Sequence, residues 1–246
     1  MKTLSALAIA MCCAIVAQGQ AKEPIFAVVN QNGIDENRYE GIEKNPYLFK
    51  EFASAEAHNK AKDEIEAYTL NFNGYTGEFE FIYQDKTIEL DQNYYDEIVV
   101  TSCVRGEDVP EKYNFESARF VKGLNPEAPG KFQMEVFSNK EIQVFKTFEA
   151  RLSSREITDP ARGVVKMETF SPGMDYFMVK DGKVHNIGLN KKKLIAVLNA
   201  PAVESFMKKN KIKVKTEQEL TRVLDFYHNL TVPETPDSEV VAASGS

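Results

Sequence analysis

Carboxylates are the most numerous side chains in this sequence that could perform acid–base chemistry. Asp91, Asp96 and Glu97 lie within seven residues, and Glu78 and Glu80 are two residues apart. Two converging carboxyl groups could act as general acid and general base in a hydrolase such as a glycosidase. In the alternating segment 78–83, however, both glutamates fall on the polar face, where solvated charges are expected. A carboxylate-based hydrolase is therefore the least favoured of the three functions that the sequence suggests.

Histidine and cysteine give little support for a catalytic or metal site. His58, His185 and His228 fall in separate segments without a carboxylate or cysteine at metal-ligand spacing. Cys103 has no histidine nearby in the sequence to activate its thiol, so an inert thiol in the core is expected. The sequence has no Gly-x-Ser-x-Gly, phosphate-binding glycine loop or His-Glu-x-x-His. We therefore expect no enzyme, no cofactor and no catalytic, cofactor-binding or metal-binding residues.

Lysines are concentrated near the C-terminus of a chain whose formal net charge is −7. Between Asn190 and Lys215 the only acidic residue is Glu204. Such segregation is typical of contact with an anionic surface or an acidic partner, although solvated helix faces have the same composition. The overall acidity argues against nucleic acid as a partner. The candidate partner-binding basic patch consists of Lys191, Lys192, Lys193, Lys208, Lys209, Lys211, Lys213 and Lys215.

The N-terminus has the pattern of a secretory signal peptide. Lys2 precedes an apolar run over 4–16, and small residues follow at the spacing of a cleavage site. The run is too short to span a bilayer, and no later segment is apolar enough to do so. We therefore expect residues 1–21 to be a signal peptide and the mature protein to be exported. Its expected location is the periplasm, including association with the outer membrane, or the medium.

Alternation of apolar and polar residues dominates the first two thirds of the mature chain. The segments 68–72, 78–83 and 87–90 alternate and are separated by turn residues, which predicts an antiparallel meander with one buried face. Lys146 interrupts the apolar stripe of a long strand predicted over 141–152. A short helix is predicted over 54–62, a loop over 123–130 and a connector over 155–163. Further strands are predicted over 98–103, 117–121, 132–137 and 164–170.

The last third predicts a hairpin followed by helices. Asp181-Gly182 is a two-residue hairpin turn, which would pair Val179 with Val184. Asn190 is placed to cap a helix over 191–198, and Pro201 suits the first turn of a second helix. Thr216 and Glu219 form the pattern of a capping box that opens a third helix with one apolar stripe.

These elements predict an α+β fold: an antiparallel meander sheet or partial barrel, followed by a β-hairpin and two to three short C-terminal helices. A hydrophobic content of 43% is enough for a globular core. The predicted organisation is a signal peptide over 1–21, a β-rich domain over 22–155, a hairpin-plus-helix module over 164–230, and a disordered tail over 231–246.

Four segments resemble a family of exported proteins from Bacteroidetes-type bacteria. They are Asn45-Pro46-Tyr47-Leu48 with Phe52, the pattern from Leu70 to Phe81, the Lys180–Val184 hairpin, and the closing 215–227 helix. Together they cover about half of the mature chain, and residues 104–165 show no match. The resemblance implies a β-rich domain followed by a hairpin and helices in an exported protein. It implies no activity.

Three functions remain open at the level of the sequence. The first is a non-enzymatic exported binding or accessory protein, acting with protein partners in a cell-envelope assembly. The second is a curved sheet that binds a small apolar molecule, which would require a deep aromatic-lined cavity. The third is the carboxylate hydrolase, which would require two acidic side chains converging in a cleft.

Overall fold

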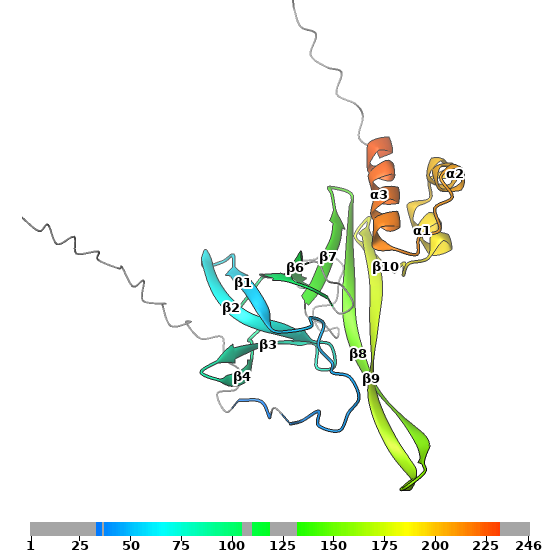
Figure 1. Cartoon of the computed structure of the whole chain (residues 1–246). Helices are drawn as coiled ribbons and strands as arrows, with labels where there is room; N and C mark the ends of the chain where they lie inside the picture. The colour runs from blue at the N-terminus through cyan, green and yellow to red at the C-terminus, as the bar shows by residue number, and fades with distance from the viewer. Residues whose placement is uncertain (1–32, 36, 105–109, 119–131, 232–246) are drawn as a thin grey trace, which may run out of the picture.

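The computed structural model describes residues 33–35, 37–104, 110–118 and 132–231 (Figure 1). The predicted signal peptide, the predicted loop over 123–130 and the predicted tail beyond Thr231 lie outside the described residues. The described strands are β1 (Ala53–Asn59), β2 (Glu64–Asn73), β3 (Glu78–Tyr83), β4 (Lys86–Glu89), β5 (Glu97–Ser102), β6 (Glu111–Ser117), β7 (Phe132–Ser138), β8 (Ile142–Asp159), β9 (Gly163–Lys180) and β10 (Lys183–Asn186). The described helices are α1 (Lys191–Leu198), α2 (Pro201–Lys209) and α3 (Glu217–Thr231).

The strands form one antiparallel sheet made of two meanders. The order is β10-β9-β8-β7-β6-β5-β1-β2-β3-β4, so β1–β4 and β5–β10 each follow the chain and meet where β1 pairs with β5. Because β4 and β10 are the two ends of this order, the sheet is open. The three helices follow the sheet in the chain. The structure therefore confirms the predicted α+β fold with a meander sheet and C-terminal helices.

The sheet curls so that the turn after β2 reaches β8. The backbone N–H of Ala150 donates to the carbonyl of Gly74 at 2.9 Å. A Cβ at Gly74 would lie 2.4 Å from two ring carbons of Phe148, so the close approach of these two segments requires glycine. This contact joins β8 to a turn whose strands, β2 and β3, are not its neighbours in the sheet order, and the sheet remains open.

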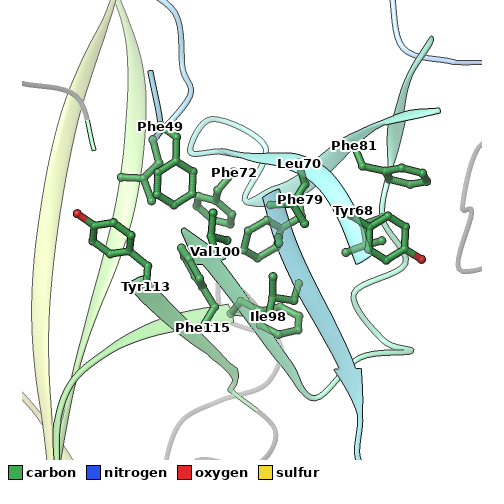
Figure 2. Close-up of a cluster of buried hydrophobic side chains, with 14 of the residues drawn as sticks. Phe49, Tyr68, Leu70, Phe72, Phe79, Phe81, Ile98, Val100, Tyr113 and Phe115 are labelled. Carbon is green, nitrogen blue, oxygen red and sulfur yellow. The ribbon is translucent and has the colours of Figure 1, made fainter. Parts of the chain in front are cut away.

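An aromatic core fills the region between these strands. Figure 2 shows ring side chains from neighbouring strands packed against one another. Phe79 is fully buried, and its ring centroid lies 5.0 Å from Phe72, 4.9 Å from Phe115 and 5.7 Å from Phe132, in edge-to-face contacts. Such geometry adds to the stabilisation from area burial alone. This core contains most of the large side chains that the alternating pattern predicts to be buried.

The helix predicted in the first half of the chain is wrong. Residues 54–62 do not form a helix, because Ala55 and Ala57 are buried in strand β1, which pairs on both sides. The helix propensity of alanine is small and yields to this pairing. Residues 119–121 of the strand predicted over 117–121 lie outside the described residues; the strand described here is β6, in which Tyr113 and Phe115 face the core. Cys103 is half-buried just after β5 and is not a core residue, which corrects a further expectation.

The predicted connector over 155–163 is also wrong. β8 and β9 pair without a register shift from Ile142–Lys180 to Asp159–Gly163, so this segment is the end of a hairpin of two 18-residue strands. The strand predicted over 164–170 and the first strand of the predicted Asp181-Gly182 hairpin are parts of the single strand β9. Polar residues on both faces hid this strand, because alternation marks only strands with one buried face.

The C-terminal module follows the sequence prediction closely. The Asp181-Gly182 turn pairs Val179 with Val184, as predicted. Asn190 caps α1, since its side chain accepts the N–H groups of Lys192 and Lys193, and Pro201 begins α2. The apolar stripe of α3 is buried against the sheet and the other helices, in a second cluster that includes Leu220, Val223, Leu224 and Tyr227.

Both residues of the predicted capping box at the start of α3 make capping contacts, and Glu219 also reaches further back along the chain. The hydroxyl of Thr216 accepts the N–H of Glu219 at 3.2 Å. The carboxylate of Glu219 accepts the N–H of Lys215 at 2.8 Å and that of Lys213 at 3.4 Å, and these hydrogen bonds lower the pKa of Glu219. The segment before α3 is therefore held to its first turn. Of the helices described, none is long and apolar enough to cross a membrane.

Candidate functional site

Glu80 is the most deeply buried carboxylate described, which corrects the expectation of a solvated position. Glu80 is 1% exposed, and Arg38 Nη2 lies 2.6 Å from both of its carboxylate oxygens. The hydroxyl of Tyr47 donates to it at 2.7 Å and the amide of Asn73 at 2.8 Å. All its hydrogen bonds come from within the fold, so Glu80 is a structural anchor rather than a catalytic acid.

The stretch 37–52, which precedes β1 and which we call the lead-in, explains this burial. Arg38 and Tyr47 belong to the stretch of chain that precedes β1, and the backbone N–H of Leu48 donates to the carbonyl of Phe72 at 2.9 Å. This stretch covers the face of β3 that the alternating pattern assigns to solvent. Glu80 therefore ties the lead-in to the sheet.

The other predicted carboxylate group is also taken up by structural contacts. Asp91 accepts the N–H of Asn93, which closes a local turn. Asp96 accepts the N–H of Lys60 at 2.6 Å. Glu97 lies in β5 with Lys60 Nζ 3.4 Å away. The structure does not gather these three side chains into an acid–base pair within the described residues.

A row of carboxylates crosses the outer face of the sheet. Glu97 pairs directly with Glu116 on β6, and Glu135 lies on β7 beyond it. Burial raises the pKa of Glu116; Lys60 opposes this rise and Glu97 adds to it. Burial also raises the pKa of Glu135, with further contributions from Glu116 and Glu97. Among the described residues no cluster of His, Cys, Asp or Glu could hold a metal ion, this row included.

The row of carboxylates predicts that removing one of its charges stabilises the protein, by an amount that depends on pH. Directly opposed like charges cost about 0.2–1 kcal/mol, so Glu116→Gln should raise the free energy of unfolding by about that amount at pH 7. The pKa of Glu116 is higher in the folded state than in the unfolded state, so the native protein takes up this proton first as the pH falls. The repulsion between Glu116 and Glu97 then disappears. The gain should therefore shrink towards pH 4. Urea unfolding at both pH values checks this, with the exposed Glu56→Gln as control; a gain that grows in acid would contradict it.

The histidines remain in separate places. His58 lies in β1, with Nδ1 3.9 Å from Glu97, and His185 lies in β10. His228 Nδ1 lies 3.2 Å from the side-chain amide of Asn139, which joins α3 to the turn before β8. None of the three faces another in a way that suggests shared chemistry.

All eight lysines of the candidate basic patch lie on the outside of the helical module. Seven are exposed and Lys191 is half-buried. Among the described residues no acidic side chain lies within ion-pair distance of any of the eight; only Lys193 has a polar side-chain contact, with Asn186 at 3.3 Å. From Lys211 to Lys215 the chain alternates, with Ile212 and Val214 buried. The lysines between them are thereby held outward.

A groove of about 750 Å³ lies where α3 meets the sheet. Its floor contains Lys146, which is 8% exposed and whose Nζ lies 2.8 and 2.9 Å from the two carboxylate oxygens of Glu217. The hydroxyl of Tyr176 donates to Glu217 at 2.7 Å, and burial followed by this hydrogen bond raises the pKa of Tyr176. The Lys146 ammonium also lies 5.6 Å from the ring centroid of Tyr113. This groove therefore combines charged and aromatic side chains that could contact a small ligand.

The third candidate surface is the end of the β8–β9 hairpin, which we call the arm and define as residues 151–169. Figure 1 shows it projecting away from the rest of the molecule. Nearly all of its side chains are exposed or half-exposed, including Leu152 and Val164. A two-stranded ribbon is only marginally stable by itself, so an arm of this length is typical of a surface that another molecule covers.

The sequence pattern indicates the lysines of the basic patch but neither the groove nor the arm. Lys146 was a visible signal for the groove, because it breaks an apolar stripe, but its partner Glu217 is 71 residues away. Nothing in the local pattern marks the arm. Comparisons with known proteins return no match to a family model, to a curated protein or to a solved structure.

Proposed function

We propose that the protein is an exported, non-enzymatic binding protein that acts as an accessory subunit of a cell-envelope assembly. In this proposal its helical module rests on an anionic lipid surface of the envelope, and its protein partners bind elsewhere. The observation that carries the proposal is the set of eight lysines on the outside of one module of an otherwise acidic protein, none of which has an acidic side chain at ion-pair distance among the described residues.

The type of basic residue supports a diffuse anionic surface. The segment 190–215 contains lysine and no arginine. Arginine is favoured where carboxylates or phosphates are bound in a fixed two-pronged geometry, whereas lysine acts as a mobile point charge. Clusters of four to eight basic residues attract anionic lipid, at about 1 kcal/mol for each lysine near the surface.

The module is rigid enough to present these charges together. Leu194 and Leu198 of α1 and Val203 and Met207 of α2 are buried in the cluster shared with the sheet. The lysines therefore stand on a packed scaffold, which lowers the entropic cost of using them at once.

Charge reversal tests this proposal. Lys192→Glu, Lys208→Glu, Lys209→Glu and Lys211→Glu together should weaken binding to vesicles containing anionic lipid by about 100-fold or more, because each lysine contributes about 1 kcal/mol. Co-sedimentation at about 0.1 M salt measures it, and high salt should release the wild type.

The matched control carries the same four-fold reversal on exposed lysines outside the helical module, at Lys50, Lys86, Lys112 and Lys140. It should keep most of the binding. An equal loss in the control would show a net-charge effect, and absence of wild-type binding to anionic vesicles would refute lipid contact.

Small-molecule binding in the groove at α3 is a second candidate function, favoured by its volume and by the polar floor around Lys146. Native mass spectrometry of the protein from its own cells would detect a retained molecule. Loss of that molecule in Lys146→Met combined with Glu217→Leu would locate it in the groove. Recovery of the ligand-free mass alone would count against this function.

A further inference from the structure

We propose that the α2–α3 linker, residues 210–216, is the part of the basic patch that contacts anionic lipid directly, and that its strained backbone is kept to present Lys211, Lys213 and Lys215 to the lipid. This inference rests on the proposed lipid contact of the helical module. It names the segment that makes the contact, so it can fail while that proposal stands.

The linker begins at a helix end of a kind that favours glycine but holds a lysine. The N–H of Lys211 donates to the carbonyl of Lys208 at 3.3 Å, and the N–H of Ile212 donates to that of Met207 at 2.9 Å. These two bonds form the Schellman pattern, in which the residue after the C-cap is left-handed and is usually glycine. Lys211 has a φ of +56° at this position, so it carries a conformational cost that glycine would avoid.

A second left-handed residue of the linker is Val214, whose φ is +55°. For a β-branched side chain this conformation is a genuine outlier. Val214 is nevertheless fully buried, as is Ile212, and both side chains belong to the apolar cluster of the helical module. Strained residues persist only where the surrounding structure enforces them, and they are concentrated at functional sites. The strain therefore singles out the linker within the basic patch.

Contacts with α3 hold both ends of the linker. The carboxylate of Glu219 accepts the N–H groups of Lys213 and Lys215, at 3.4 and 2.8 Å, on either side of the strained valine. At the start of the linker, Arg222 donates to the side chain of Asn210 at 3.2 Å. Glu219 is thereby a positioning residue for the two lysines whose backbone it binds.

The lysines of the linker are less engaged than those of α1. Lys211, Lys213 and Lys215 are exposed, and none of their side chains makes a hydrogen bond or an ion pair with a described residue. In α1, Lys191 is half-buried and Lys193 lies 3.3 Å from an asparagine of β10. Each lysine near an anionic surface contributes to binding, so the segment with the most unengaged lysines contributes most.

Replacing Lys211 by glycine should have opposite effects on stability and on lipid binding. The thermal unfolding midpoint should rise by about 2 °C, because the left-handed position favours glycine. Binding to vesicles of equal parts phosphatidylglycerol and phosphatidylethanolamine should weaken about fivefold, which is the contribution of one lysine near an anionic surface. Lys211→Gln should weaken binding equally without the gain in stability. Circular dichroism and co-sedimentation measure the two effects.

Two matched variants separate the linker from the rest of the module. Asn199 at the end of α1 is exposed and also left-handed, with a φ of +48°, so Asn199→Gly changes a similar helix end without changing the charge. It should leave vesicle binding unchanged. Lys192→Gln removes one exposed charge from α1 and should weaken binding by less than about twofold.

Variants of Glu219 test its positioning role at constant net charge. Glu219→Ala and Glu219→Gln remove the same negative charge, but glutamine keeps an oxygen that can accept one of the two N–H groups. Glu219→Gln should therefore bind the vesicles about fivefold more tightly than Glu219→Ala. Glu204→Ala removes an exposed carboxylate of α2 and should bind more tightly than the wild type, as expected for the loss of a negative charge alone. Circular dichroism checks that these variants fold.

The outcomes separate the two proposals. Equal losses of binding for Lys211→Gln and Lys192→Gln would overturn the linker as the contacting segment and leave lipid contact by the whole module intact. Wild-type binding by Lys211→Gly, or equal binding by Glu219→Ala and Glu219→Gln, would overturn it as well. Absence of wild-type binding to these vesicles would overturn both proposals, including where the lysines bind an acidic protein instead.

Discussion

Replacing Glu80 by alanine should lower the free energy of unfolding by about 3–5 kcal/mol, the effect of breaking a buried ion pair by removing one partner. Arg38, Tyr47 and Asn73 all direct donors at this carboxylate, and each would be left facing a cavity. The lead-in would lose its main polar attachment to β3.

Urea unfolding monitored by circular dichroism measures the loss, with the exposed Glu56→Ala as control. Glu56 has a side chain that is 63% exposed, so its removal should change the stability by no more than about 0.5 kcal/mol. Glu80→Gln keeps the side-chain volume, so its loss of stability should fall between those of Glu80→Ala and Glu56→Ala. A Glu80→Ala loss as small as that of the control would show that the buried network contributes little.

The second large effect is expected at Phe79, whose replacement by alanine should cost about 3–5 kcal/mol. The ring is fully buried and contacts Phe72, Phe115 and Phe132 at edge-to-face distances, so its removal leaves a cavity among side chains that cannot all move to fill it.

The control on the same strand is Ile82→Ala, because Ile82 points to solvent and is 46% exposed. Its loss should be within about 0.5 kcal/mol. Phe79→Leu should cost less than alanine, since part of the volume is kept. Equal costs at Phe79 and Ile82 would contradict the assignment of the core.

Much of this fold follows from local signals. The Asp181-Gly182 turn, the Asn190 cap and the α3 stripe were predictable because each depends on residues within one turn of one another. The alternating strands 68–72 and 78–83 were predictable because one face is buried.

Other features depend on contacts that are distant in the sequence. Glu80 reads as a solvated residue until Arg38, 42 positions earlier, is seen to lie over it. Ala55 and Ala57 form a strand because β2 and β5 pair with it on either side. The arm escaped prediction for the opposite reason, since strands exposed on both faces have no alternation to detect.

The candidate functional surfaces also differ in how far the local sequence predicts them. The basic patch is a property of composition and could be predicted from the sequence, although its outward placement depends on buried neighbours such as Ile212 and Val214. The arm depends on the pairing of β8 with β9, and no local pattern reports that pairing. The groove shows both aspects, with Lys146 visible as an interruption and Glu217 placed by the packing of α3.

The measurement that tests the accessory role most directly is recovery of the protein from gently lysed cells that make it. We predict that the mature chain co-purifies with envelope proteins and that the lysine-reversed variant loses the association with lipid. Recovery of the wild-type chain as a lone soluble monomer under the same conditions would contradict the account.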